Sequence, residues 1–370
     1  MAKKATSSES SNKFQDVLDR LNKTYGVGSI LALDSKSHGD YDLISTGSIG
    51  FDHITLGIGG FAKGKLYELR GWEGTGKSTI CGHAVAECQK QGGKVLYIDG
   101  EYAVDKNYFQ QLGVDTTKML IAQPTCGEEG FNIAMEMINT GEIDLVVIDS
   151  DSSLIPKKML DGDVGDSTIG RKALLNSNAY PKLKGALSKH NVCVIVISQY
   201  REKIGIMFGN PTTTQGGHAL KFYSDCIIEC TKSAVKEGDQ QYGNLTKLKT
   251  IKNKMFPPYR KSEFEIVYGV GIDKFKEIMV LGNEFDILRK YGKTITYADV
   301  KYQAEEFEEL LTDNPEFLDS ITNDIVAKIK LMETPEGVEE EEEEFTVEPT
   351  APTTKYEELK KQALINNGLI

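Results

Sequence analysis

Four nearly continuous apolar runs mark the first 200 residues of the chain. They are KLYELRG, KVLYIDGE, DLVVIDS and VCVIVISQ, which begin at Lys65, Lys94, Asp144 and Val192. Strands that are apolar on both faces are typical of parallel sheets covered on both sides. The segments between the runs are long enough for crossover helices, for example residues 77–91. The pattern therefore predicts an α/β doubly wound fold, in which ligands bind where the strands end.

The pattern changes after residue 220. Three consecutive strand candidates follow, CIIECTKS, LTKLKTIKNK and EFEIVYGVGI, joined by short turns. They predict an antiparallel extension of the parallel sheet. Residues 274–330 have apolar positions spaced for helices and predict a small α-rich C-terminal domain. Near the other end, residues 12–25 predict an amphipathic helix with one apolar face. That face carries Phe14, Val17, Leu18, Leu21 and Tyr25.

These changes predict four segments. Residues 1–36 form an N-terminal arm and helix, 37–273 the core, 274–330 the small C-terminal domain, and 331–370 an acidic, mostly disordered tail. The net charge is −12, and the tail contributes −8 of it through eleven acidic residues and three lysines. The rest of the chain is therefore only weakly acidic, which does not exclude a polyanionic partner. The tail either keeps the protein soluble or competes with DNA for a basic surface.

The composition favours a cytoplasmic protein. The six cysteines form no C-x-x-C pair, and they are expected to be free thiols in a reducing compartment. No apolar run approaches the ~20 residues of a membrane helix. The first residues, MAKKATSSESSNK, lack the apolar region of a secretory signal.

The strongest local signal is GWEGTGKS, residues 71–78, which matches the P-loop pattern G-x-x-x-x-G-K-[ST]. An apolar strand candidate precedes it and a helical segment follows, as the motif requires. Backbone N–H groups of the loop are expected to bind phosphate oxygens, Lys77 to meet the β- and γ-phosphates, and Ser78 to ligate Mg²⁺. The motif thus predicts ATP and Mg²⁺ as cofactors. The predicted nucleotide-binding residues are Gly71, Trp72, Glu73, Gly74, Thr75, Gly76, Lys77, Ser78 and Thr79.

Polar residues that end three other apolar runs are the candidates for catalysis. Asp149 is placed to hold Mg²⁺ as a Walker B aspartate, although an aspartate at a strand end can also cap a helix. Glu101 follows another strand and is placed to polarise an attacking water, although it can also be a surface carboxylate. Gln199 ends the fourth run and leads directly into a long irregular loop, where it could sense the γ-phosphate.

That loop is QYREKIGIMFGNPTTTQGG, residues 199–217. Cations that follow a phosphate backbone, together with apolar side chains that contact bases, are the components of single-strand binding. Arg201 and Lys203 fit the first role, and Ile204, Met207 and Phe208 fit the second. The alternatives are a lid over a small substrate and plain disorder. A second glycine-rich stretch, residues 161–174, carries Arg171 and Lys172.

Across residues 12–285 the chain resembles the bacterial RecA family of DNA strand-exchange recombinases. The resemblance is carried by ISTGS, GWEGTGKST, YIDGEYAVD, LVVIDS, VGDSTIG, KIGIMFGNPTTTQGG, ALKFY, VKEG and IKNK. KIGIMFGNP with the following GG and ALKFY is specific to this family, whereas P-loops occur in many ATPases. The resemblance implies a RecA-like P-loop ATPase core and a DNA-dependent ATPase. It also implies helical filaments on single-stranded DNA that pair it with homologous duplex in recombinational repair.

The resemblance also implies residue roles. Glu101 matches the catalytic glutamate and Gln199 the glutamine that couples ATP to the DNA loops. Tyr108, with Asp105 nearby, matches an aromatic residue that packs on the adenine. Lys252 and Lys254 match lysines that reach the ATP of the neighbouring subunit. The implied DNA-binding residues are Ile169, Gly170, Arg171, Lys172, Arg201, Lys203, Ile204, Met207, Phe208, Gly209, Asn210, Gly216 and Gly217.

The resemblance implies a homo-oligomeric filament, with DNA and a LexA-like repressor as further partners in the response to DNA damage. The apolar face of the N-terminal helix and Phe222 are then expected at subunit interfaces. One departure lies in the P-loop, where Trp72 stands in place of the usual proline. Two other functions stay open at this point: a DNA-binding scaffold with weak strand exchange, and a hexameric helicase.

Overall fold

The computed structural model describes residues 6–25, 30, 41–163, 170–202, 212–214 and 217–333. The chain divides into two units, residues 1–329 and 330–370. The second unit is described only through residues 330–333. The finer division into four segments stays a prediction.

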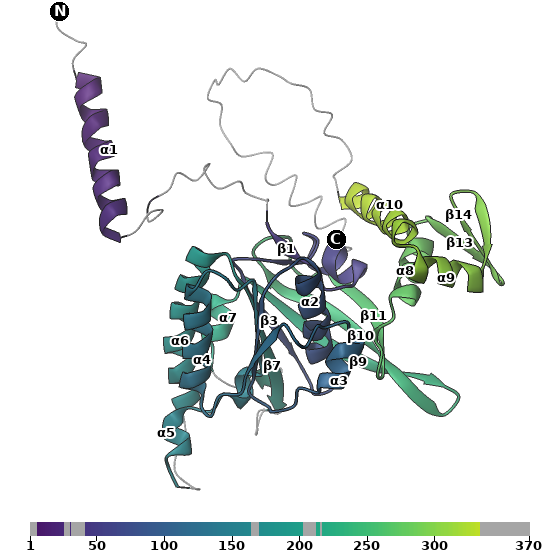
Figure 1. Cartoon of the computed structure of the whole chain (residues 1–370), viewed down its shortest axis with the longest axis horizontal. Coiled ribbons are helices and arrows are strands. Elements are labelled where there is room, and N and C mark those ends of the chain that lie inside the picture. Colours follow the sequence, from purple (N-terminus) through teal and green to yellow (C-terminus); the bar gives the residue numbers. More distant parts are fainter. Residues whose placement is uncertain are drawn as a thin grey trace, which may run out of the picture. The chain divides into compact units, whose positions relative to one another are not determined.

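A large mixed sheet forms the centre of the first unit (Figure 1). Nine of its strands follow the order β12-β11-β10-β9-β3-β7-β6-β4-β5, and a tenth, β8, pairs with β7. The strands from β9 to β5 pair in parallel, as the continuous apolar runs predict. The parallel strands are β3 (Leu66–Gly71), β4 (Val95–Asp99), β5 (Met119–Ala122), β6 (Leu145–Asp149), β7 (Cys193–Glu202) and β9 (Cys226–Glu237).

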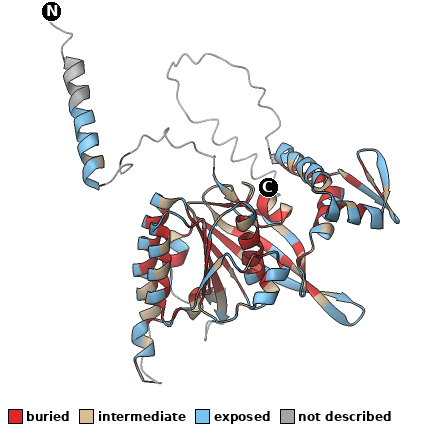
Figure 2. Cartoon of the chain, viewed as in Figure 1, coloured by how far each residue is buried: buried red, intermediate tan, exposed pale blue. Residues whose placement is uncertain are grey.

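Helices cover both faces of this sheet, and the strands between them are buried (Figures 1 and 2). On one face, apolar residues of α2 and α3 pack with the strands in one core cluster. On the other face, α4, α6 and α7 form a second cluster. The two clusters share the strands because successive side chains of a strand point to opposite faces. The helices are α2 (Lys77–Lys90), α3 (Lys106–Gln111), α4 (Gly127–Asn139), α6 (Arg171–His190) and α7 (Ala219–Tyr223).

The antiparallel extension is confirmed. Long strands β9 and β10 pair along almost their whole length, and β11 pairs with β10. Polar residues on their exposed face alternate with buried ones, which is typical of a sheet edge that faces solvent on one side. The extension consists of β10 (Gln240–Asn253), β11 (Lys261–Val267) and β12 (Gly271–Ile272). The short β8 (Thr212–Thr214) pairs separately with β7.

The apolar spacing of the C-terminal region predicts helices. The region is rich in helices, but it is not purely helical. A three-stranded antiparallel sheet lies between its helices, in the order β13-β14-β15. These strands and the helices share a separate core that includes Ile295, Phe307 and Ile325. The elements are α8 (Lys274–Glu284), β13 (Leu288–Tyr291), β14 (Thr294–Tyr297), β15 (Val300–Gln303), α9 (Ala304–Asp313) and α10 (Pro315–Glu333).

Three further features complete the described chain. The predicted N-terminal helix is present as α1 (Thr6–Tyr25), and it leaves Phe14 67% exposed. All six cysteines are buried free thiols, as predicted. None of the described helices is long and apolar enough to cross a bilayer. The remaining short elements are β1 (Leu43–Ile44), a π-helical turn (Gly50–Thr55), β2 (Phe61–Ala62), a 3₁₀ turn (Asp151–Ser153) and α5 (Lys157–Leu160).

Candidate nucleotide site and DNA-binding elements

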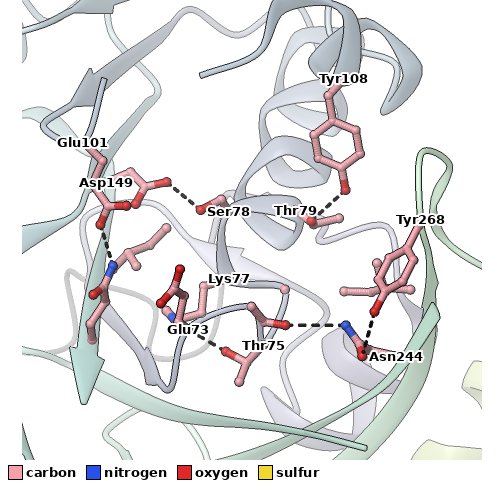
Figure 3. A pocket seen from close by; sticks show the side chains of 15 residues that line it. Glu73, Thr75, Lys77, Ser78, Thr79, Glu101, Tyr108, Asp149, Asn244 and Tyr268 are labelled. Atoms are coloured by element: carbon pink, nitrogen blue, oxygen red, sulfur yellow. Dashed lines mark hydrogen bonds between the residues drawn. The ribbon is translucent and has the colours of Figure 1, made fainter. Parts of the chain in front are cut away.

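A pocket of about 240 Å³ lies where the parallel strands end (Figure 3). It gathers residues from the P-loop, from the end of β6, from β7, and from the antiparallel strands β10 and β11. The prediction that Gln199 ends its strand is wrong, because β7 continues to Glu202 and pairs there with β8. The polar end of this pocket is the predicted phosphate and metal site. Its lining comprises Glu73, Gly74, Thr75, Gly76, Lys77, Ser78, Thr79, Glu101, Tyr108, Asp149, Ile197, Gln199, Asn244, Ile266 and Tyr268. Gly71, Trp72 and Asp105, also predicted to bind nucleotide, are outside that lining.

The P-loop backbone requires glycine at two positions. Gly74 has φ of 68° and Gly76 has φ of 88°, both in the left-handed region that disfavours other residues. A Cβ atom on Gly76 would also lie 2.3 Å from Ile266 Cδ1. Gly76 is the N-cap residue of α2, so the loop delivers unpaired backbone N–H groups to the pocket. Such a helix start favours phosphate binding.

Lys77 is buried at the floor of the loop, with 6% of its surface exposed. Its ammonium donates to the carbonyl oxygens of Trp72 at 2.7 Å and Gly71 at 3.2 Å, and to Thr75 Oγ1 at 3.3 Å. Burial lowers the pKa of the ammonium. A phosphate oxygen competes for the same three N–H donors, and its negative charge would compensate the burial of the cation.

Ser78 and Asp149 form the candidate metal site. Ser78 Oγ donates to Asp149 Oδ2 at 2.7 Å, and Tyr97 Oη donates to the same oxygen, also at 2.7 Å. Burial raises the pKa of Asp149, while the two hydroxyl donors oppose that shift. Two hard oxygen ligands side by side fit Mg²⁺, which usually takes one or two protein ligands and completes its shell with water and phosphate oxygens. Tyr97, which lies inside an apolar run, is an unpredicted partner of this site.

The candidate catalytic carboxylate is held by donors from two strands. Gln199 Nε2 donates to Glu101 Oε1 at 2.6 Å, and Ser150 Oγ donates to the same oxygen at 2.7 Å. Glu101 itself is exposed to solvent and lines the pocket with Lys77. The other carboxylate oxygen, Oε2, is therefore available to a water molecule beside the phosphate site.

The opposite end of the pocket is aromatic. Tyr108 Oη and Thr79 Oγ1 are 2.8 Å apart, which fixes the ring predicted to pack on a base. Asn244 of β10 and Tyr268, which directly follows β11, face this ring (Figure 3). Neither of the two was predicted, because no local motif marks residues of the antiparallel strands. Asp105 instead caps α3 by accepting from Tyr108 N at 2.9 Å.

The predicted DNA-binding residues are only partly described. Ile169 and the segment from Lys203 to Asn210, with Gly216, lie outside the described residues. Arg201 is exposed in β7, and β7 pairs with β8 at the base of the loop. Gly170 and Gly217 both have positive φ at the ends of the two loops, where glycine is favoured.

The two cations that follow the first loop are engaged within the protein. The Lys172 ammonium is directed inward, donating to Leu154 O at 2.6 Å and lying 3.6 Å from Asp151 Oδ1. This placement does not favour a DNA contact by Lys172. Arg171 donates to Lys158 O at 2.5 Å and is half-buried.

Lys252 and Lys254 are far from the P-loop of their own chain. Lys252 pairs with Ile227 in the β9–β10 ladder, and Ile227 pairs with Glu68 near the start of β3. The P-loop begins at Gly71, at the other end of the same strand. The Lys252 ammonium donates to the carbonyl oxygens of residues 221 and 222, and Lys254 lies 3.3 Å from Asp225. A nucleotide that contacts these lysines must therefore be bound by another subunit.

Comparison with known proteins decides the family. Residues 12–273 match the model of the RecA N-terminal domain. The chain belongs to the RecA family. It is 45% identical to Protein RecA of Cytophaga hutchinsonii over 332 residues, which is 89% of this chain and 93% of that protein. It is 43% identical to Protein RecA of Porphyromonas gingivalis over 315 residues, 84% of this chain and 92% of that protein.

A more distant bacterial relative gives the same result. Protein RecA of Clostridium tetani is 42% identical over 317 residues, 85% of this chain and 90% of that protein. RecA membership over nearly the whole chain makes this protein a recombinase, which binds DNA and ATP and acts in DNA recombination and repair. The scaffold and helicase alternatives are not favoured.

Proposed function

We propose that the chain is a DNA-dependent ATPase that uses Mg²⁺–ATP to form filaments on single-stranded DNA. The observation that carries this proposal is that Lys77, Ser78, Asp149, Glu101 and Gln199 all line one pocket. The set combines a cation that donates hydrogen bonds to phosphate oxygens, a pair of metal ligands, and a carboxylate near the position of the attacking water. A nucleotide-binding site without hydrolysis would need no such carboxylate.

Each residue has a distinct role in the proposed reaction. The P-loop N–H groups and Lys77 bind the phosphates, and Ser78 and Asp149 hold the metal ion, which neutralises charge that develops on the γ-phosphate. Glu101 orients and polarises the attacking water. Gln199 donates to Glu101 at 2.6 Å, so a γ-phosphate that attracts the amide changes both the carboxylate and the strand that enters the DNA loop.

The active site is completed by a second subunit. Lys252 and Lys254 extend to the ATP of a neighbour, where they stabilise the transition-state charge as an arginine finger does. The exposed apolar face of α1 and Phe222, 74% exposed, supply contacts between subunits. The two loops at residues 161–172 and 200–217 bind single-stranded DNA, without a contact from the inward-directed Lys172 ammonium. Duplex DNA is the second substrate. A LexA-like repressor is proposed as a partner of the assembled filament.

The testing experiment is ATP hydrolysis with and without single-stranded DNA, over a range of salt concentration. Strong stimulation that is lost at high salt is expected, because the loop contacts phosphates and salt weakens such contacts. At low salt, stimulation should also fall when the DNA is shorter than the length that several subunits cover. ATP turnover that is the same with and without DNA would contradict the proposal.

A further inference from the structure

A contact between two aromatic rings joins the P-loop to the base of the DNA loop. The indole of Trp72 and the ring of Tyr200 are 5.9 Å apart between centroids, with an interplanar angle of 67°. This edge-to-face geometry is a favourable arrangement for aromatic pairs. Trp72 is the second residue of the phosphate loop, and Tyr200 directly follows Gln199. The contact therefore links a phosphate-binding segment to the strand that enters the loop at residues 203–211.

Tyr200 is fixed on its other sides. The guanidinium of Arg70 lies over its ring, 5.9 Å from the centroid. Its hydroxyl donates to Glu229 of β9. Arg70 is opposite Glu229 in the β3–β9 ladder, so the side chains around Tyr200 come from one face of the sheet. Tyr200 also pairs with Thr214 at the base of the β7–β8 hairpin. A movement of the Tyr200 ring is thus transmitted to that hairpin.

Gln199 and Tyr200 are consecutive residues of β7 that point to opposite faces of the sheet. Gln199 is directed into the pocket and bonds to Glu101, whereas Tyr200 points to the other face, as alternation along a strand requires. Gln199 is therefore placed to respond to the γ-phosphate. Tyr200 is placed to respond to the conformation of the P-loop, through its contact with Trp72.

A chemical change at the P-loop can move the indole. The carbonyl oxygen of Trp72 accepts a hydrogen bond of 2.7 Å from the Lys77 ammonium. Thr75 Oγ1 donates to the same carbonyl oxygen at 3.0 Å. When phosphate oxygens draw the ammonium away, the Trp72 peptide keeps only the Thr75 bond and is held less tightly. Because the indole is 41% exposed, it can change position without disrupting the core.

We propose that Trp72 and Tyr200 are positioning residues that couple nucleotide binding at the P-loop to DNA binding through the β7–β8 hairpin. This inference rests on the proposed function, since it requires ATP at the P-loop and DNA at the loop. It adds a route that does not pass through Gln199 and Glu101. It also gives a role to the residue that replaces the usual P-loop proline.

The chain provides its own probe, because Trp72 is the only tryptophan in the sequence. The full-length protein is titrated with oligo-dT, with and without a non-hydrolysable ATP analogue and Mg²⁺, while tryptophan emission is recorded. The wild type should change emission on adding the analogue and again on adding DNA. Tyr200→Leu should keep the response to the analogue and lose the response to DNA. Tyr200→Phe, which keeps the ring, should retain both.

A second readout measures the coupling. The ratio of DNA affinity with the analogue to that with ADP should fall about two- to tenfold in Trp72→Leu and in Tyr200→Leu, the range expected for one aromatic pair. The double variant should fall no further than either single one, because both remove the same contact. Trp72→Leu keeps the inference testable if Tyr200→Leu does not fold.

The outcomes distinguish a failure of this inference from a failure of the proposed function. An unchanged affinity ratio in both single variants, or additive losses in the double variant, would overturn this inference alone. A wild type that binds neither the analogue nor oligo-dT would overturn the proposed function, and the inference with it.

Discussion

Gln199 Nε2 lies 2.6 Å from Glu101 Oε1, although β6 separates the strands that carry the two residues. The bond crosses the end of the sheet and places a neutral donor against the candidate catalytic carboxylate. Because it leaves the Glu101 charge in place, Gln199 can orient the carboxylate without neutralising it. This arrangement is consistent with the proposed role of Glu101 in polarising water beside the P-loop.

Replacing Glu101 with Gln should separate ATP binding from hydrolysis. The side chain keeps its size, but an amide does not accept a proton, so turnover should fall by about 100-fold or more. ATP affinity should change little, and complexes with single-stranded DNA should last longer. Steady-state hydrolysis and DNA dissociation rates measure the two effects. Glu308→Gln, an exposed change in α9, is the control and should match the wild type.

Lys77→Met should remove nucleotide binding without weakening the fold. The lysine is buried and burial lowers its pKa, so an apolar side chain of similar length removes the cost of burying a charge. The free energy of unfolding in the absence of ATP is expected to rise by about 1 kcal/mol. Nucleotide titration and urea unfolding of the same sample test both parts. A large loss of stability would show that the three hydrogen bonds of the ammonium outweigh its burial.

Mixing two inactive variants tests whether the active site is shared. Lys77→Ala has a defective P-loop and intact lysines, whereas Lys252→Ala has the reverse. In an equal mixture, about a quarter of the interfaces join an intact P-loop to an intact lysine if the lysine acts on its neighbour. ATP hydrolysis should then return to about a quarter of the wild-type rate. A site contained within one chain gives no recovery on mixing.

Stability should depend on pH through a buried carboxyl pair beside the C-terminal region. Burial raises the pKa of Asp52 to about 7 and that of Glu277 to about 6. The charge of Glu277 raises the pKa of Asp52 further, whereas hydrogen bonds and the charge of Lys274 oppose the rise at Glu277. The folded protein binds these protons more tightly than the unfolded chain. Their stabilisation is therefore complete below the unfolded pKa values near 4 and is lost as pH rises to about 7.

Denaturant unfolding between pH 5 and 8 measures this effect. Asp52→Asn should flatten the decline in unfolding free energy over that range, since the amide has no proton to lose. The control is Asp115→Asn, whose carboxyl has its pKa lowered to about 2 by hydrogen bonds from Thr117 and Lys118. It should leave the slope above pH 5 unchanged. An equal slope in the wild type and Asp52→Asn would remove Asp52 from the explanation.

The parallel core could be predicted from the sequence because its strands are buried on both faces. Continuous apolar runs as short as the one that forms β6, rich in β-branched residues, favour a buried strand over a buried helix. The edge strand β5 was missed because it is short and its central residues, Leu120 and Ile121, are half exposed. The three-stranded sheet of the C-terminal region was missed because each strand has only four residues and one aliphatic position.

The residues of the candidate site also differ in how far the sequence predicts them. Residues within the P-loop and at strand ends could be predicted, since a local pattern or a strand boundary marks them. Tyr97, Asn244 and Tyr268 could not, because their part in the site depends on which strands meet in space. The contact of Trp72 with Tyr200 is of this second kind. It depends on the parallel register that places Gly71 beside Gln199.

The P-loop begins at the end of β3, whereas Lys252 of β10 lies level with a residue near the start of β3, and this makes the subunit directional. Stacked head to tail, such subunits leave an unpaired P-loop at one tip and unpaired lysines at the opposite tip. If the ATPase centre is shared between subunits as proposed, a row holds one complete centre fewer than its number of subunits, and short rows are the least active per subunit. The two tips differ in chemistry, and growth and loss of subunits are expected to proceed at different rates from each.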